Sequence, residues 1–139
     1  GRVMDDKTQP RYYNYFGFNA GRTLGGLHQI KSTTSKMMVV EGFFDLIRGY
    51  PWAAARDASI VCTWRAEMTP KQAELILALD KLVSIWYDLD DAGTKGWDKA
   101  RKLMEDVTYG LRRATWSGDF DVGAMDETSF NSIWKSLWR

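Results

Sequence analysis

Four stretches of this sequence are rich in aliphatic and aromatic residues and lack the regular alternation of a half-exposed strand. They read "KMMVVEG" at 36–42, "DASIVCTW" at 57–64, "LVSIWYD" at 82–88 and "VTYGLRRATW" at 107–116. Continuous apolar strands are buried on both faces, which is typical of parallel sheets covered by helices. The sequence therefore predicts strands that pair in parallel inside an α/β domain.

Segments with helical character separate these strands, and we expect helices over 43–50, 69–81, 92–106 and 126–139. The clearest helix start is "TPKQ", where Thr69 is a capping residue, Pro70 occupies the first turn and Gln72 reaches back to complete a capping box. Alternating strands and helices favour right-handed crossovers between parallel strands. We therefore expect an open, mainly parallel four-stranded α/β sheet of Rossmann-like type, flanked by helices.

The first 35 residues do not follow this alternation. The stretch "RYYNYFGFNAGRTLGGL" at 11–27 mixes aromatic residues with glycines, which supply the backbone angles of tight turns. We therefore divide the chain into a small appendage of strands and turns over 1–35 and an α/β domain over 36–139.

The composition limits the class of protein and the kind of metal site. The 139 residues include one Cys and one His, too few soft ligands for a zinc site, so a bound metal needs oxygen ligands. No apolar stretch approaches the ~20 residues of a membrane span, and the amino-terminal segment lacks the apolar region of a signal peptide. We therefore expect a cytoplasmic domain that binds neither zinc nor a membrane.

The net charge of +1 does not by itself indicate a nucleic-acid partner, but the charges are unevenly distributed. Cations are frequent in the first third of the chain, whereas acids gather near 88–91 and 119–127. One interpretation is an acidic metal pocket beside a basic face that holds a polyanion. The other is a mixed, solvated surface, and the charges alone leave both open.

Acidic residues follow three of the predicted strands. Glu41 ends the first strand, Asp88 and Asp90 end the third, and "SGDFDVGAMDE" at 117–127 follows the fourth with Asp119 and Asp121. Ligands of open α/β sheets lie beyond the carboxyl ends of the strands, where these acids meet. A hard divalent cation such as Mg²⁺ offsets the repulsion between clustered carboxylates. The D-x-D spacing lets both acids of each pair face one metal.

Two acids near this edge also have local structural roles to consider. Asp45 lies one turn into the predicted helix at 43–50, where the helix dipole favours a carboxylate. Asp91 stands where a capping residue belongs before "AG", and we expect it to cap the following helix rather than bind a metal.

The combination of "VVEGFFD" with "DLDDAG" about forty residues later resembles the TOPRIM domain of bacterial-type primases, topoisomerases and some nucleases. The segments "PRYYN" at 10–14, "AGRTLGGL" at 20–27 and "MTPKQ" at 68–72 are similar to motifs of bacterial and phage replicative primases. The resemblance covers nearly the whole chain. It implies a TOPRIM sheet over 36–139 and places 1–35 at the end of the preceding primase core subdomain.

The resemblance also implies roles for individual residues. The implied catalytic residues are Glu41, Asp88 and Asp90. The implied ligands of Mg²⁺ or Mn²⁺ are Glu41, Asp45, Asp88, Asp90, Asp119 and Asp121. Arg11, Asn14 and Arg22 match residues that face the template or nucleotide phosphates. Ala20 stands where primases commonly have a lysine, and Lys31 or Lys36 is expected to compensate for it.

These roles predict metal-dependent nucleotidyl transfer that makes an RNA primer on single-stranded DNA from nucleoside triphosphates, with a replicative helicase as a further partner. A TOPRIM nuclease that uses the same acids is an alternative, as is a replication module that binds nucleic acid without turnover. Primases of this class carry further domains, so we expect either a fragment of a larger primase, which need not be active alone, or a reduced phage-encoded form. The expected location is the cytoplasm of a bacterial cell or of a phage-infected host.

Overall fold

The structure is a computed structural model, and it describes residues 16–105 and 110–139. Its sheet contains β1 (Lys36–Val40), β2 (Ala58–Cys62), β3 (Leu82–Trp86) and β4 (Arg112–Arg113) in the order β2-β1-β3-β4. All three strand pairings are parallel, as the sequence predicts. The connecting helices are α1 (Phe43–Ala54), α2 (Pro70–Leu77), α3 (Asp91–Met104) and α4 (Glu127–Leu137). The open parallel α/β sheet is therefore confirmed.

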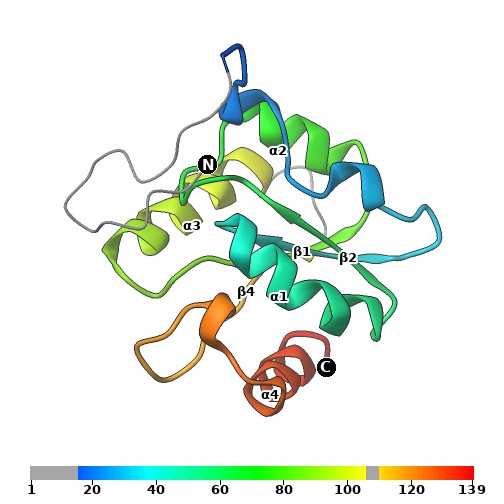
Figure 1. The fold of residues 1–139 in the computed structure, drawn as a ribbon, viewed down its shortest axis with the longest axis vertical. Helices are drawn as coiled ribbons and strands as arrows, with labels where there is room; N and C mark the ends of the chain where they lie inside the picture. The colour runs from blue at the N-terminus through cyan, green and yellow to red at the C-terminus, as the bar shows by residue number, and fades with distance from the viewer. Residues whose placement is uncertain (1–15, 106–109) are drawn as a thin grey trace.

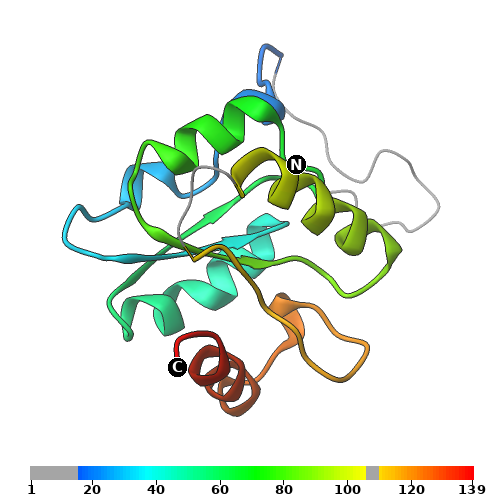
Figure 2. The same ribbon diagram turned by 180° about the vertical axis from the view of Figure 1, so that it is seen from behind.

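Helices cover both faces of the sheet, α1 and α4 on one and α2 and α3 on the other (Figures 1 and 2). Alternate residues of β1 divide between the two layers: Met38 packs in the core beneath α1 and α4, while Met37 and Val39 pack beneath α2 and α3. All three side chains are fully buried. This burial on both faces explains why the strand sequence is continuously apolar.

Stacked aromatic side chains fill the layer between the sheet and α4. The Trp86 ring, fully buried on β3, lies 4.9 Å from the Phe130 ring centroid and 6.5 Å from that of Trp134. Its indole Nε1–H donates a 2.9 Å hydrogen bond to Ser84 Oγ, so the polar edge of the ring is satisfied inside the core. This packing fixes the end of β3, the strand that leads to Asp88.

Helix α1 is longer than the sequence predicts. We expected a helix over 43–50, but it continues through Pro51 to Ala54. Two of the added residues, Trp52 and Ala53, are buried, and the Trp52 ring lies 5.0 Å from that of Phe130. Burial of this turn outweighs the hydrogen bond that proline removes from a helix.

The predicted fourth strand is mostly absent from the described residues. Only 112–113 pair with β3, although we expected a strand over 107–116, and 106–109 lie outside the described residues. An edge strand has one neighbour instead of two, so pairing constrains its length less than that of β1 or β3.

The appendage contains short 3-10 helices, η1 (Ala20–Arg22) and η2 (Leu27–Gln29), where we expected short strands. Among the described residues of the appendage, strand pairing is limited to one antiparallel bridge between Gly25 and Cys62. A Cβ atom on Gly25 would approach Cys62 Sγ to 2.4 Å, so only glycine fits this close crossing.

Gln72 ties the appendage to the domain. The capping box predicted at the start of α2 is present, with Thr69 N–H donating to Gln72 Oε1 at 3.0 Å. The fully buried amide Nε2 also donates to the carbonyl oxygens of Ala20, Thr23 and Thr63 at 2.8, 2.9 and 3.0 Å. One side chain thereby joins η1, the end of β2 and α2. Within the described residues, no helix is both long and apolar enough to cross a membrane.

We predict that Gln72→Met lowers the free energy of unfolding by about 2–4 kcal/mol, because it leaves buried carbonyl groups without donors while keeping a similar side-chain volume. Urea unfolding followed by circular dichroism measures this change. Lys71→Ala is the control. Lys71 is exposed and, within the described residues, its ion pair is with Glu74, so its loss changes the free energy of unfolding by less than about 0.5 kcal/mol. Equal effects of the two substitutions would contradict this role for Gln72.

A carboxylate cluster at the carboxyl edge of the sheet

Glu41 and Asp88 meet where β1 and β3 end. The two strands are adjacent and parallel, and their last paired residues are Val40 and Trp86. Just beyond this pair, Glu41 Oε1 accepts a 3.0 Å hydrogen bond from the backbone N–H of Asp88. Both acidic residues are half-buried. The structure thus brings together the first two acids that the sequence places at this edge.

Asp45 connects the first turn of α1 to the acidic segment that follows β4. Its Oδ2 accepts from the backbone N–H of Gly42 at 3.0 Å, and its Oδ1 accepts from that of Gly123 at 2.9 Å. Gly123 belongs to the 3-10 helix η3 (Val122–Ala124). The carboxylate therefore occupies the favourable position near a helix start and also holds η3 against the edge of the sheet.

The residue that caps α3 is Asp90, and our expectation of Asp91 was wrong. Asp90 has extended backbone angles, and its Oδ1 accepts from the N–H of Gly93 at 2.7 Å, whereas Asp91 is the exposed first residue of the helix. A Cβ atom on Gly93 would lie 1.9 Å from the carbonyl oxygen of Asp88. The glycine of "DLDDAG" therefore lets the helix start lie directly against Asp88.

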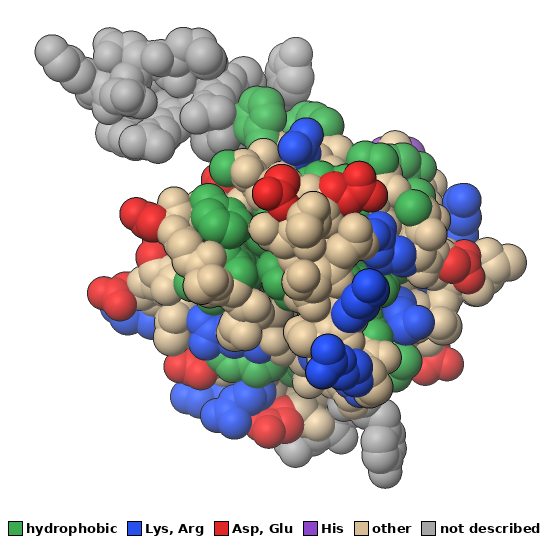
Figure 3. All heavy atoms as spheres, turned by 90° about the horizontal axis from the view of Figure 1, so that it is seen from below, with side chains coloured by type: hydrophobic (Ala, Val, Ile, Leu, Met, Phe, Trp, Pro, Cys, Tyr) green, Lys and Arg blue, Asp and Glu red, His purple; other side chains and the backbone are tan. Residues whose placement is uncertain are grey.

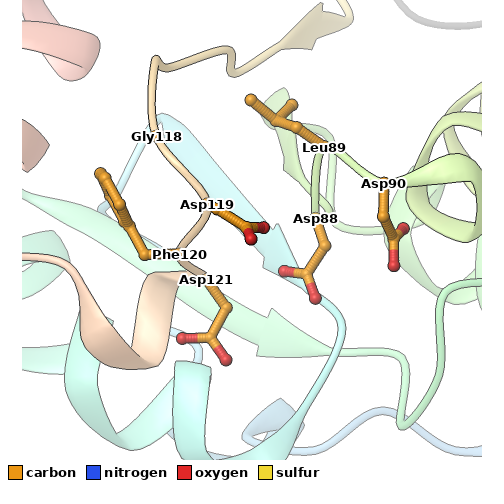
Figure 4. A pocket seen from close by; sticks show the side chains of 7 residues that line it. All are labelled: Asp88, Leu89, Asp90, Gly118, Asp119, Phe120 and Asp121. Carbon is orange, nitrogen blue, oxygen red and sulfur yellow. The ribbon is translucent and has the colours of Figure 1, made fainter.

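A cleft of about 310 Å³ opens beside Asp88, and Figure 4 shows acidic side chains on both of its sides. It is lined by Asp88, Leu89, Asp90, Gly118, Asp119, Phe120 and Asp121. The Asp119 side chain points toward Asp88 in this view. Asp121 Oδ1 caps η3 by accepting the N–H of Ala124 at 2.8 Å, so the two members of the second D-x-D pair have different surroundings.

The electrostatics of the cluster favour protonation. Burial, followed by repulsion from Asp88, raises the pKa of Glu41 from 4.5 to about 7. Burial, followed by repulsion from Asp45, Asp121 and Asp90, raises the pKa of Asp88 from 3.8 to about 6. Burial also raises the pKa of Asp45. No Lys or Arg of residues 16–105 and 110–139 forms an ion pair with these acids, so the cluster has an uncompensated negative charge.

The donor chemistry of the cluster fits a hard cation. Its side chains offer only oxygen ligands, and the single Cys62 is buried in β2. Glu41 and Asp90 each use one oxygen in a hydrogen bond to backbone, which leaves the other oxygen for a cation. Among the described residues, however, no three acidic, His or Cys side chains already converge closely enough to hold a metal ion.

The predicted nucleic-acid contacts are placed at different parts of the molecule. Arg22 is exposed on η1, which packs on α2 and lies near Arg65, three residues beyond the end of β2. Lys31 lies near the first residues of β2, at the opposite edge of the sheet from the carboxylates. Arg11 and Asn14 lie outside the described residues. On the face shown in Figure 3, basic and acidic side chains are interspersed, which agrees with the mixed-surface interpretation for that face.

Arg48 is a positioning residue that we did not identify from the sequence. Its Nε and a terminal nitrogen both donate to the carbonyl oxygen of Met125, at 3.3 and 3.2 Å. It therefore anchors the segment after η3 to α1, three residues beyond Asp45. An arginine on a helix surface resembles any solvated cation, so only this long-range contact reveals its role.

The comparisons with known proteins agree with this geometry. No protein-family model matches the sequence. The chain is 33% identical over 109 residues to a DNA primase of Aquifex aeolicus (strain VF5), a match that covers 74% of the chain and 21% of that primase. The chain is a DNA primase homologue. The resemblance to primases predicted from the motifs is thereby confirmed.

Solved primase structures share the fold of this primase homologue. The zinc-binding and RNA polymerase domains of the Aquifex aeolicus primase match with a TM-score of 0.74 and 25% identity, over 99% of this chain and 35% of that one. A DnaG primase catalytic domain bound to ssDNA matches with a TM-score of 0.70 and 22% identity, over 99% of this chain and 45% of that one. The primase homologue thus spans about a fifth of the curated relative and less than half of these structures.

We predict that the stability of the metal-free primase homologue decreases as the pH rises from about 4.5 to 7. The folded-state pKa of Glu41 is raised, so ionisation of this group opposes folding across that interval, with a further contribution from Asp88. Glu41→Gln mimics the protonated side chain. We therefore expect Glu41→Gln to have about the same free energy of unfolding as the parent near pH 5. At pH 7.5 we expect it to be about 1–2 kcal/mol more stable, which is less than the full pKa shift implies because solvent screens this partly exposed side chain.

Urea unfolding in EDTA at both pH values measures this difference. Glu74→Gln, at an exposed carboxylate on α2, is the matched control and is expected to show no such pH dependence. A Glu41→Gln variant that is less stable than the parent at pH 7.5 would show that the Glu41 charge stabilises the fold.

Proposed function

We propose that this primase homologue performs metal-dependent nucleotidyl transfer for RNA primer synthesis, as the TOPRIM part of a longer primase. The main support is the contact between Glu41 and Asp88 at the carboxyl edge, within an acidic cluster without an ion-pair partner among the described residues. The match to a DNA primase supports the reaction class. In this proposal 36–139 form the TOPRIM domain and 1–35 form the end of the preceding subdomain.

The proposed cofactor is Mg²⁺, with Mn²⁺ as a substitute. Glu41, Asp88 and Asp90 are the proposed catalytic ligands, and Asp45, Asp119 and Asp121 are further candidates at the same edge. When bound, the cation aligns phosphate oxygens and neutralises charge that develops during phosphoryl transfer. Asp90 and Asp119 line the cleft and are exposed, so their free oxygens are accessible to a cation.

The residues of the chain contribute orientation and charge. The Asp88 N–H fixes one oxygen of Glu41, and the Gly93 contact fixes the backbone of Asp88. Asp45 and Arg48 hold the segment of η3 against α1, which keeps Asp121 beside Asp88. These contacts fix the Asp88 backbone and one oxygen of Glu41 before a substrate binds, which reduces the reorganisation needed for reaction.

Single-stranded DNA is the proposed template, because one structural neighbour is a DnaG catalytic domain bound to ssDNA. Nucleoside triphosphates are the proposed substrates, and Arg22 is a candidate contact for their phosphates or for the template. A replicative helicase remains a proposed partner, and the cytoplasm of a bacterium or of a phage-infected host remains the proposed location.

A TOPRIM nuclease would use the same carboxylates, so the site alone does not separate synthesis from hydrolysis. The curated relative and the solved structures described above are primases, which favours synthesis. Incubation of the chain with single-stranded DNA, Mg²⁺ and labelled nucleoside triphosphates separates the two reactions. Longer labelled products support the primase proposal, whereas shortened DNA supports the nuclease.

We predict that Asp88→Asn weakens Mg²⁺ binding by on the order of 10-fold or more, because it removes a central negative ligand from the cluster. Isothermal titration of Mg²⁺ into the parent and the variant measures the affinity. Asp98→Asn, at an exposed acid of α3 outside the cluster, is the matched control and is expected to keep the parent affinity. Unchanged binding in Asp88→Asn, or no binding to the parent, would show that the cluster is not a metal site.

A further inference from the structure

Three aromatic side chains form a partly exposed group at the carboxyl edge of the sheet. The Phe18 ring packs edge-on against Trp64 with a centroid distance of 5.4 Å, and the Phe43 ring stacks on Trp64 at 6.2 Å. Phe18 and Phe43 remain 39% and 47% exposed. These three residues, here called the aromatic platform, present ring surface to solvent although they contact one another.

The aromatic platform lies beside the carboxylate cluster. Trp64 follows β2, and Phe43 is the first residue of α1, which follows β1. Phe43 is two residues after Glu41, so their Cα atoms are at most about 7.6 Å apart. Because β1 lies between β2 and β3, the platform occupies the β2 side of this edge and the carboxylates occupy the β3 side.

Trp64 has an unusual local structure. Its φ angle is +68°, a left-handed conformation that is unfavourable for a bulky side chain. Its indole Nε1–H is buried and has no hydrogen-bond partner. The ring packs against the margin of the core and contacts the partly exposed Phe18 and Phe43.

Two cations flank the aromatic platform. Arg65 follows Trp64, and one of its terminal nitrogens lies 3.0 Å from the position of a Cβ on Gly21, next to Arg22. Both arginines are exposed, and in the described part of the chain neither has a carboxylate within ion-pairing distance. Arg22 and Arg65 therefore add positive charge beside the platform, which complements a polyanion.

We propose that the aromatic platform stacks against a base of single-stranded nucleic acid, with Phe43 as the main contact and with Arg22 and Arg65 near the backbone phosphates. Exposed rings combined with unpaired cations are the features with which proteins bind single strands independently of sequence. A single ring contact of this kind gives a preference for bases over a bare sugar–phosphate backbone. This inference rests on the proposed function, because the nucleic-acid strand that stacks on the platform is the same strand that approaches the carboxylates.

The test compares binding of two fluorescein-labelled oligonucleotides of equal length, oligo(dT) and an abasic oligonucleotide, to the full chain by fluorescence anisotropy. The parent is expected to bind oligo(dT) about 10-fold more tightly, within the range measured for stacking on one aromatic side chain. Phe43→Leu keeps an apolar side chain but removes the ring, so it is expected to abolish this preference. Phe43→Tyr keeps the ring and is expected to retain it.

Tyr50→Leu provides the matched control, because Tyr50 is a 40% exposed aromatic residue of the same helix near the start of β2, at the opposite edge of the sheet. It is expected to leave both affinities unchanged. Equal binding of the two oligonucleotides by the parent, no binding of either, or an undiminished preference in Phe43→Leu would overturn the proposal.

Two further measurements distinguish a nucleic-acid contact from a protein contact and from the metal site. If light scattering shows that the chain self-associates through Phe43 while the base preference is unchanged in Phe43→Leu, the platform is a protein contact and the proposal is wrong. Titration of Mg²⁺ into Phe43→Leu is expected to give the parent affinity. Loss of the base preference with metal binding intact therefore supports the platform, whereas absence of metal binding in the parent contradicts only the proposed function.

Discussion

The parallel pairing of β1 with β3 is the constraint on which the site depends. Parallel strands end at the same edge, so the first polar residues beyond Val40 and Trp86 necessarily become neighbours. The hydrogen bond from the Asp88 N–H to Glu41 joins these two neighbours directly. The helices that follow the strands start at the same edge, and their first turns or caps add Asp45, Asp90 and Asp121 to the cluster.

This arrangement opposes stability, and the rest of the fold compensates for it. Clustered carboxylates repel one another and lose hydration, as the raised pKa values of Glu41 and Asp88 show. The stacked rings of Trp86, Phe130 and Trp134 hold β3 and α4 together beneath the cluster. The favourable contacts of the acids are hydrogen bonds from backbone N–H groups. These hydrogen bonds leave most of the negative charge available to a cation.

The predictions from the sequence were correct where burial or a local motif determined the structure. Continuous apolar runs predicted the three main strands and their parallel pairing, and the capping box at Thr69 is present as expected. The fold class follows from the same apolar runs, whereas the primase resemblance follows from the acidic and amino-terminal motifs. The edge strand was predicted less well, because its short pairing leaves little sequence signal.

Several contacts between distant segments were not predicted from the sequence. Asp90 and Asp91 are equally suitable capping residues by type, and only the path of the chain after β3 makes Asp90 the cap. Lys31 was predicted as a nucleic-acid contact together with Arg22, although Lys31 lies near the start of β2 and Arg22 lies next to Gly21, which is close to Arg65 beyond the end of β2. The roles of Gln72 and Arg48 come from contacts across 52 and 77 residues of sequence, which no local pattern predicts.

The central claim is that the cluster at the ends of β1 and β3 is the cation site of this domain. The most direct measurement is paramagnetic broadening of backbone amide NMR signals by substoichiometric Mn²⁺. We expect the signals of Asp88, Gly93 and Gly123 to disappear first, while that of Ser59 near the start of β2 persists. Broadening that is uniform over the chain, or strongest away from the carboxyl edge, would contradict the account.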